Sequence, residues 1–284
     1  MGLLGMQPGT SAMAAEPTVR RDIEFATVEG HRLLLDLYLP AAEGDVASPP
    51  LVVWVHGGAW RAGSKKDMPL GFLLPRGYAI ASVDYRLSPV AKFPAQVHDI
   101  KAAIRFLRAS QAKYGFKADR VAIAGSSAGG HLAALVGVTN GHAALEGTVG
   151  EHLDPSSSVQ AIVDLYGPTN FYTILKQSTP HGLSVRVPAF ELLLGGLPEQ
   201  KRELATLASP VAHVDANDPP LLMLHGDQDP QVPINQSHEL DGAYQDAGAR
   251  SHLVVVHGGA HGGPQFFDEA RQKRIREFLD EVIK

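Results

Sequence analysis

The sequence predicts an α/β fold, in which a mostly parallel central sheet of about eight strands carries helices on both faces. Short apolar runs alternate along the chain with longer segments whose apolar residues recur at helical spacing. The runs 51–55, 121–124 and 221–224 are continuously apolar, which is typical of strands buried on both faces. Such runs end in loops rich in glycine, histidine, serine and aspartate. Because ligands bind beyond the carboxyl ends of the strands in open α/β sheets, a functional site is expected there.

The predicted elements follow one another in a regular order. Residues 22–28 and 31–39 alternate apolar and polar side chains around Glu29-Gly30, which predicts a hairpin with one face in water. The other predicted strands are 51–55, 78–86, 121–124, 159–166, 219–224 and 251–256. Helices are expected at 68–76, at 94–114, from about 129, at 235–247 and at 266–284.

The length and composition fit one large domain, since the chain has 284 residues of which 44% are hydrophobic. We expect this domain at 21–284, with a lid or insertion at about 170–217, where strands and helices stop alternating. Residues 1–20 are expected to be a disordered leader or the remnant of an export signal. Ala12 to Pro17 resembles a cleavage site, but the basic and long apolar segments of a complete signal are missing. The location stays open between export, to the periplasm or outside, and the cytoplasm.

The composition also disfavours several classes of partner and chemistry. The formal net charge is −5 and no basic patch stands out, which argues against nucleic acid. No apolar run reaches the roughly 18 residues that a membrane span requires, so no membrane partner is predicted. The chain contains no cysteine, which excludes disulfides, zinc–thiolate sites and a cysteine nucleophile.

The central motif is Gly125-Ser126-Ser127-Ala128-Gly129, which joins a predicted strand to a predicted helix. This Gly-x-Ser-x-Gly spacing is typical of a nucleophile elbow. A strand that turns sharply into a helix strains the residue at its tip, so the neighbours of that residue must be small. Ser127 would therefore present its hydroxyl at the turn, with the N-terminal end of the helix behind it. Ser126 is the alternative nucleophile, but only Ser127 has a glycine two positions before and after it.

A second glycine-rich loop, His56-Gly57-Gly58-Ala59-Trp60, follows the predicted strand 51–55. Glycines allow backbone N–H groups to approach a ligand closely. By the pattern of such loops, the N–H groups of Gly58 and Ala59 would join that of Ala128 in an oxyanion hole. Trp60 and Tyr166 follow strand ends, and each would either form part of an aromatic wall around the substrate or pack in the core.

A serine hydroxyl becomes a good nucleophile only when a positioned base removes its proton. Asp229 and His261 follow later strand ends, and the order serine, acid, histidine is a known arrangement of such a triad. Ser127 would attack a carbonyl, His261 would carry the proton and Asp229 would orient His261. Asp227 and His257 are the alternative acid and base. Asp229 is preferred because Pro230 fixes its turn, and His261 because it lies in a loop able to reach the serine.

Other polar residues are given structural interpretations. Asp84, Arg86 and Asp99 could form a catalytic charge cluster, but an ion-pair network that ties a strand to a helix is favoured. His131 is expected on the surface of the elbow helix or against the lid, without a catalytic role. The aspartates and histidines that follow the last two strands lack the spacing of known metal motifs, so no metal or other cofactor is predicted.

With these motifs the sequence resembles the α/β-hydrolase superfamily, and within it the hormone-sensitive-lipase-like and feruloyl-esterase-like carboxylesterases. The likeness extends from about Arg21 onward, and the segments that carry it are 56–60, 84–88, 125–130, 225–229 and 260–262. Lipase-like members have His-Gly-Gly-Gly where this chain has Ala59 and Trp60 after the first two glycines. The chain therefore resembles the His-Gly-Gly-x-Trp branch, which includes feruloyl and carbohydrate esterases and also kynurenine formamidases.

The resemblance implies a serine carboxylesterase that forms an acyl-enzyme and cleaves short-chain acyl or hydroxycinnamoyl esters. Its substrate would be a small-molecule or carbohydrate-linked ester. An arylformamidase or a peptidase of the same fold is an alternative, because it would use the same triad. A non-catalytic binding module is a further alternative, disfavoured because the serine and the histidine are both present. Whether the protein forms a homo-oligomer stays open.

Overall fold

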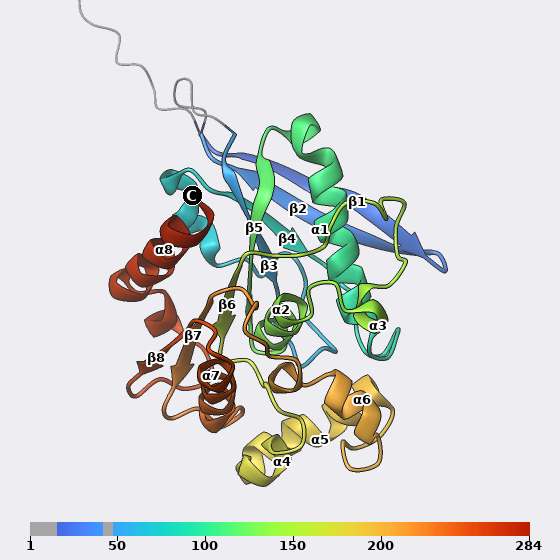
Figure 1. The fold of residues 1–284 in the computed structure, drawn as a ribbon, viewed down its shortest axis with the longest axis vertical. Helices are drawn as coiled ribbons and strands as arrows, with labels where there is room; N and C mark the ends of the chain where they lie inside the picture. The colour runs from blue at the N-terminus through green and yellow to red at the C-terminus, as the bar shows by residue number, and fades with distance from the viewer. Residues whose placement is uncertain (1–15, 42–47) are drawn as a thin grey trace, which may run out of the picture.

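A computed structural model describes residues 16–41 and 48–284 of the chain (Figure 1). Most of the leader expected at 1–20 lies outside the described residues, and the strand β1 already begins at Thr18. The strands form one sheet of eight with the order β1-β2-β4-β3-β5-β6-β7-β8. The pairs β1–β2 and β2–β4 are antiparallel, and the strands from β4 across to β8 pair in parallel. The predicted mostly parallel sheet of about eight strands is therefore confirmed.

The strands lie where the sequence places them, within a few residues at each end. Their bounds are β1 Thr18–Val28, β2 His31–Leu39, β3 Pro50–Val55, β4 Ala79–Val83, β5 Lys117–Ser126, β6 Ala161–Leu165, β7 Leu221–Gly226 and β8 Ser251–Val256. The side chains of β3 and β4 are buried almost throughout, as expected for continuously apolar parallel strands. The hairpin β1–β2 is exposed along much of β1, which agrees with its alternating sequence.

Helices cover both faces of the sheet. Their bounds are η1 Leu70–Arg76, α1 Ala95–Tyr114, α2 Ala128–Val138, α3 Ala143–Glu146, α4 Ile174–Gln177, α5 Pro180–Leu194, α6 Arg202–Leu207, η2 Pro210–Ala212, α7 Asn235–Ala247, η3 Pro264–Phe267 and α8 Glu269–Ile283. The helix predicted at 266–284 is divided, because the Asp268 side chain accepts a hydrogen bond from the N–H of Arg271 and caps α8. The helix predicted at 68–76 is a 3₁₀ helix.

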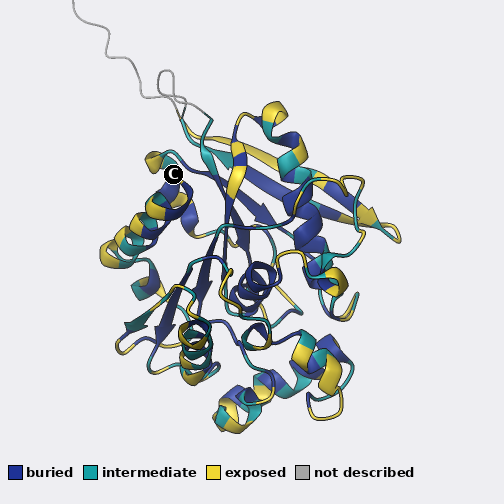
Figure 2. Ribbon diagram, in the orientation of Figure 1, coloured by how far each residue is buried: buried dark blue, intermediate teal, exposed yellow. Residues whose placement is uncertain are grey.

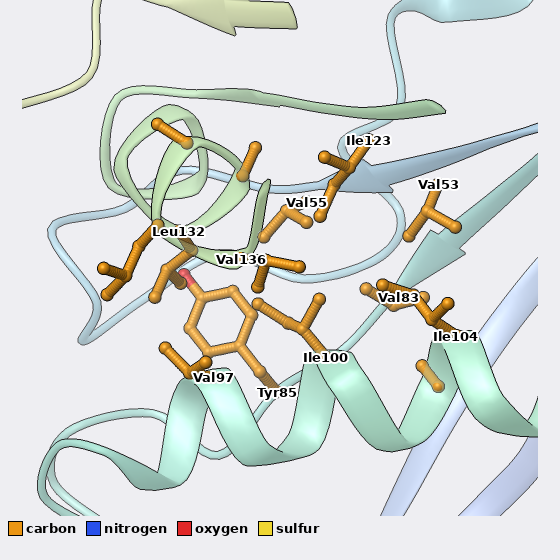
Figure 3. Packing of buried hydrophobic residues seen from close by; sticks show 14 of the residues in the cluster. Val53, Val55, Val83, Tyr85, Val97, Ile100, Ile104, Ile123, Leu132 and Val136 are labelled. Atoms are coloured by element: carbon orange, nitrogen blue, oxygen red, sulfur yellow. The ribbon is translucent and has the colours of Figure 1, made fainter. Parts of the chain in front are cut away.

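Two apolar clusters, one on each side of the sheet, form the core. One cluster joins the sheet to α1, α2, α5 and α7, and the other joins it to η1, η3 and α8. Figure 2 shows the central strands and α2 buried, while α8 presents an exposed outer side. In Figure 3, Val97 and Ile100 of α1 point toward α2 and the sheet, and the Tyr85 ring lies between the two helices.

The segment expected as a lid or insertion contains the 15-residue helix α5 and the short helices α4, α6 and η2. In Figure 1 α4, α5 and α6 lie together at one end of the sheet. The α5 helix begins with Pro180 after Thr179, whose hydroxyl accepts a hydrogen bond from the N–H of Gly182. Its residues Phe190 and Leu193 are fully buried in the main cluster, so this helix is packed onto the sheet domain.

The ion pair between Arg86 and Asp99 ties the end of β4 to α1. Both nitrogens of the Arg86 fork donate to the Asp99 carboxylate, at 2.7 to 3.1 Å, and the Arg86 backbone N–H donates to it at 2.8 Å. Asp84 stands apart, since its carboxylate accepts from the N–H of Lys65. Burial raises the pKa of Asp99, and the hydrogen bonds and charge of Arg86 oppose that shift. The structural interpretation thus holds for the Arg86–Asp99 pair.

Replacing Asp99 with alanine should destabilise the protein by about 3 kcal/mol, because it leaves a largely buried guanidinium without its partner. Urea unfolding followed by circular dichroism measures this loss. Glu281→Ala is the matched control, since it breaks a similar two-pronged pair with Arg250 that lies in water. If the two variants lost equal stability, burial of the Arg86–Asp99 pair would not be the source of its contribution.

Candidate active site

The turn between β5 and α2 has the strained geometry expected of a nucleophile elbow. Ser127 has φ 54° and ψ −119°, a combination that residues with side chains rarely adopt. A Cβ at Gly125 would overlap the backbone of Gly129, and a Cβ at Gly129 would overlap the carbonyl oxygen of Val55. The two glycines are therefore required by the close approach of three backbone segments.

A continuous chain of hydrogen bonds links Ser127, His261 and Asp229. His261 Nε2 lies 2.8 Å from the Ser127 hydroxyl, and His261 Nδ1 lies 2.6 Å from a carboxylate oxygen of Asp229. The other Asp229 oxygen accepts from the N–H groups of Gln231 and Val232 at 2.8 and 2.9 Å. The structure thus brings together the serine, the histidine and the acid that the sequence analysis selected.

Asp229 is held in its charged form. Its side chain is fully buried, which alone would raise its pKa. Hydrogen bonds from His225, His261 and the Val232 backbone outweigh burial and hold the pKa of Asp229 well below its ordinary value. A carboxylate that stays charged beside His261 Nδ1 keeps a proton on that nitrogen and leaves Nε2 free to accept one.

The alternative acid and base form a separate pair. Asp227 accepts from His257 Nδ1 at 2.9 Å and from the N–H of Gly258 at 2.8 Å. These two bonds join Asp227 to the turn after β8. The His257 side chain is 85% exposed.

The loop after β3 turns sharply and lies against the elbow. Gly58, Ala59 and Trp60 all have positive φ, at 108°, 51° and 59°. The N–H groups of Arg61 and Ala62 both donate to the Gly58 carbonyl, whereas those of Gly58 and Ala59 have no partner in the part of the chain that the structure describes. Ala128 is the first residue of α2, where an N–H lacks an intrahelical acceptor.

Trp60 lies in the core instead of in the pocket wall. Its side chain is fully buried, and its Nε1–H donates to Nδ1 of His131 at 3.1 Å. His131 Nε2 lies 2.7 Å from the carbonyl oxygen of Ala208, so the ring bridges α2 and the end of the insertion. Burial lowers the pKa of His131 to about 4, which leaves it neutral. The interpretation of Trp60 as part of a substrate wall is thus wrong. His131 does not lie on the surface of the elbow helix, but it does contact the insertion, which was the other position expected for it.

Tyr166 follows β6 and lies beside the catalytic histidine candidate. It has φ 46°, and its ring meets the His261 ring edge-on with centroids 4.9 Å apart. Burial raises the pKa of its hydroxyl above the ordinary value. Tyr166 is buried on most sides, yet it lines the cavity in front of Ser127.

This cavity has a volume of about 480 Å³, within the range of small-molecule sites. Its lining combines the two glycine-rich loops with residues that the sequence analysis did not select, among them Arg61, Val185, Arg186 and Gln231. The one feature of the sequence that could have identified Arg186 as a site residue is that it is the single cation in the otherwise apolar run 185–190. A run of this kind does not indicate which end of the sheet it will reach.

The structure also bears on metal sites and on membrane-spanning helices. Among residues 16–41 and 48–284, no group of three or more histidine, aspartate or glutamate side chains is arranged to hold a metal ion. No helix in the same residues is long and apolar enough to cross a membrane.

Comparison with known proteins identifies the family. The model of the BD-FAE family matches residues 35–244, which is most of the chain. This chain belongs to the BD-FAE family. A solved structure, described as a truncated form of a carbohydrate esterase from gut microbiota, superposes with a TM-score of 0.84 at 34% identity, and the match covers 95% of this chain and 98% of that chain.

Two further relatives are esterases. The propionate-bound Est2 esterase of Thermogutta terrifontis has a TM-score of 0.74 and 26% identity, and 94% of each chain is covered. Esterase LipC of Mycobacterium tuberculosis is 34% identical over 191 residues, which is 66% of this chain and 46% of LipC. This BD-FAE chain spans about half the length of the curated relatives that it matches. The likeness confirms the α/β-hydrolase fold and the predicted resemblance to carboxylesterases.

The elbow geometry predicts opposite effects for two glycine-to-alanine substitutions. Gly129→Ala should lower the free energy of unfolding by about 3 kcal/mol, because the added methyl group meets the backbone carbonyls of Val55 and His56. Gly242→Ala, in the middle of α7 with open space around it, should raise it by about 0.5–1 kcal/mol. Urea unfolding measures both. A Gly129→Ala protein as stable as the wild type would show that the three segments separate easily.

Proposed function

We propose that this protein is a serine carboxylesterase that cleaves short-chain acyl or hydroxycinnamoyl esters through an acyl-enzyme. The observation that carries the proposal is the chain of hydrogen bonds from Ser127 through His261 to Asp229, which opens into a cavity. The N–H groups next to the serine support it, because acyl transfer requires donors where negative charge develops.

Each group has a definite role in the proposed reaction. Ser127 attacks the ester carbonyl while His261 Nε2 takes the hydroxyl proton and then gives it to the departing alcohol. The N–H groups of Gly58, Ala59 and Ala128 hold the oxyanion of the tetrahedral intermediate. Water then repeats the attack on the acyl-enzyme, and His261 again transfers the proton. Asp229 keeps the His261 ring in one orientation and stabilises its charged form.

The size of the cavity and the names of the relatives favour short or aromatic acyl groups. A volume of about 480 Å³ suits a small ester better than a long lipid chain. One similar structure is a carbohydrate esterase and another holds propionate. We further propose that residues 21–284 act as a single domain and that 170–217 covers the cavity, because Val185 and Arg186 of α5 line it. Tyr166 is the proposed aromatic contact to substrate.

A matched panel of substrates tests the proposed reaction. Turnover is measured on 4-nitrophenyl acetate, butyrate and octanoate, on methyl ferulate and on N-formylkynurenine. We expect cleavage of the acetate, the butyrate or the ferulate, with octanoate slower and the formamide inert. Preference for N-formylkynurenine would replace the proposal with an arylformamidase that uses the same residues. Inactivity on all five would contradict it.

Substitution of the triad tests the assigned roles. Ser127→Ala and His261→Ala should each lower kcat by about 10⁴-fold or more on 4-nitrophenyl acetate, because the nucleophile or its base is lost. Asp229→Asn should also be severe, at roughly 10³- to 10⁴-fold. Asp227→Asn is the matched control and should keep most of the activity, since Asp227 bonds to the exposed turn after β8 and to the neighbouring Gln228. A larger loss from Asp227→Asn than from Asp229→Asn would mean that the acid is wrongly assigned.

A further inference from the structure

The cavity in front of Ser127 contains a buried cation. Arg186, on α5, lines this cavity and its side chain is among the largest that are fully buried, with 1% of the residue exposed. Its Nε and Nη1 groups have no hydrogen-bond partner among residues 16–41 and 48–284. A guanidinium normally uses its donors fully when it leaves water, because each unused buried donor costs about 1–3 kcal/mol. Arg186 thus differs from an ordinary structural arginine.

The surroundings of Arg186 keep it charged without occupying its donors. The guanidinium carbon lies 5.7 Å from the centre of the buried Trp60 ring, a cation–π contact that leaves the N–H groups free. Burial lowers the pKa of Arg186 to about 10, with the charge of Asp229 opposing the shift, so the group is a cation at neutral pH. The two Asp229 oxygens already accept from His261, Gln231 and Val232.

The rest of the lining adds a second cation. Arg61, on the loop after β3, also faces this cavity and forms no ion pair with any residue that the structure describes. Asp67 is the acidic residue of the lining, and its carboxylate accepts from the N–H of Ser64. A ligand that enters the cavity therefore meets two arginines, and the buried one has two donors without a partner among residues 16–41 and 48–284.

We propose that Arg186 is a specificity-determining residue that binds a carboxylate of the substrate, so that the preferred esters carry a carboxylate in addition to the scissile ester bond. The proposal rests on the carboxylesterase function proposed above and names its class of substrate. A carboxylate fits because its two oxygens match the two donors of a guanidinium fork, and its charge compensates the desolvated cation. The carboxylate can belong to the acyl part or to the alcohol part of the ester.

Two pairs of esters, in each of which a carboxylate is compared with its neutral methyl ester, test the proposal. For the acyl part, mono-4-nitrophenyl adipate is compared with its neutral methyl ester. For the alcohol part, 3-acetoxybenzoate is compared with methyl 3-acetoxybenzoate. In at least one pair, the wild-type enzyme should have a kcat/KM for the charged ester roughly 10- to 100-fold higher than for the neutral one. The pair that shows the preference identifies the part of the substrate that carries the carboxylate.

Arg186→Gln should bring that ratio close to one, and Arg186→Lys should restore part of it, since lysine keeps the charge without the fork. Lys66→Gln is the matched control. It removes an exposed cation beside the lining residue Asp67 and should leave the ratio at its wild-type value. Circular dichroism establishes that the variants are folded.

A measurement on the wild-type protein keeps the test independent of the folding of the variants. Adipate should inhibit hydrolysis of 4-nitrophenyl acetate at concentrations at least 10-fold below those required of adipamide, at constant ionic strength. If no ester is cleaved at all, the proposed function fails. If neutral esters are cleaved and the charged partner is not preferred, or Arg186→Gln leaves the ratio unchanged, the carboxylate proposal is overturned while the esterase stands.

Discussion

The arrangement of the candidate site depends on the close approach of backbone at the turn between β5 and α2. The Ser127 N–H donates to the Leu165 carbonyl of β6, and the Ser127 carbonyl accepts from the N–H of His131. On the other side, Gly129 touches the end of β3 so closely that no side chain fits. The turn is thus fixed between two neighbouring strands. Because the loop after β3 is held by the same contact, the serine and the proposed oxyanion donors are positioned together.

The sequence predicted this part of the molecule well because its pattern is local. Continuous apolar runs mark buried parallel strands, and the glycines that follow them mark places where backbone must approach backbone. The order of the strands in the sheet determines which loops lie together, and the local pattern does not contain that information. Since β3, β5, β6, β7 and β8 are neighbours in the sheet, loops far apart in the sequence end at one edge. The general rule for open α/β sheets was enough to expect this.

The choice between Asp227 and Asp229 shows where local pattern stops being sufficient. Both residues follow β7 within a few positions, and each has a histidine to pair with. The turn decides between them, since the N–H groups of Gln231 and Val232 close on one oxygen of Asp229 and fix its direction. The conformation of this turn depends on contacts with the loop after β8. The spacing of residues along the chain does not reveal such contacts.

Trp60 and Arg186 were missed as a pair because their relation is tertiary. The sequence left Trp60 open between a substrate wall and the core, and the structure shows it buried and bonded to His131 through its Nε1–H. The face of the same indole ring supports the Arg186 guanidinium. One side chain therefore connects the elbow helix, the loop after β3 and the α5 helix. An aromatic ring holds a cation in place without using its donors, whereas a carboxylate partner would have occupied them. This difference is what leaves Arg186 able to bind a ligand.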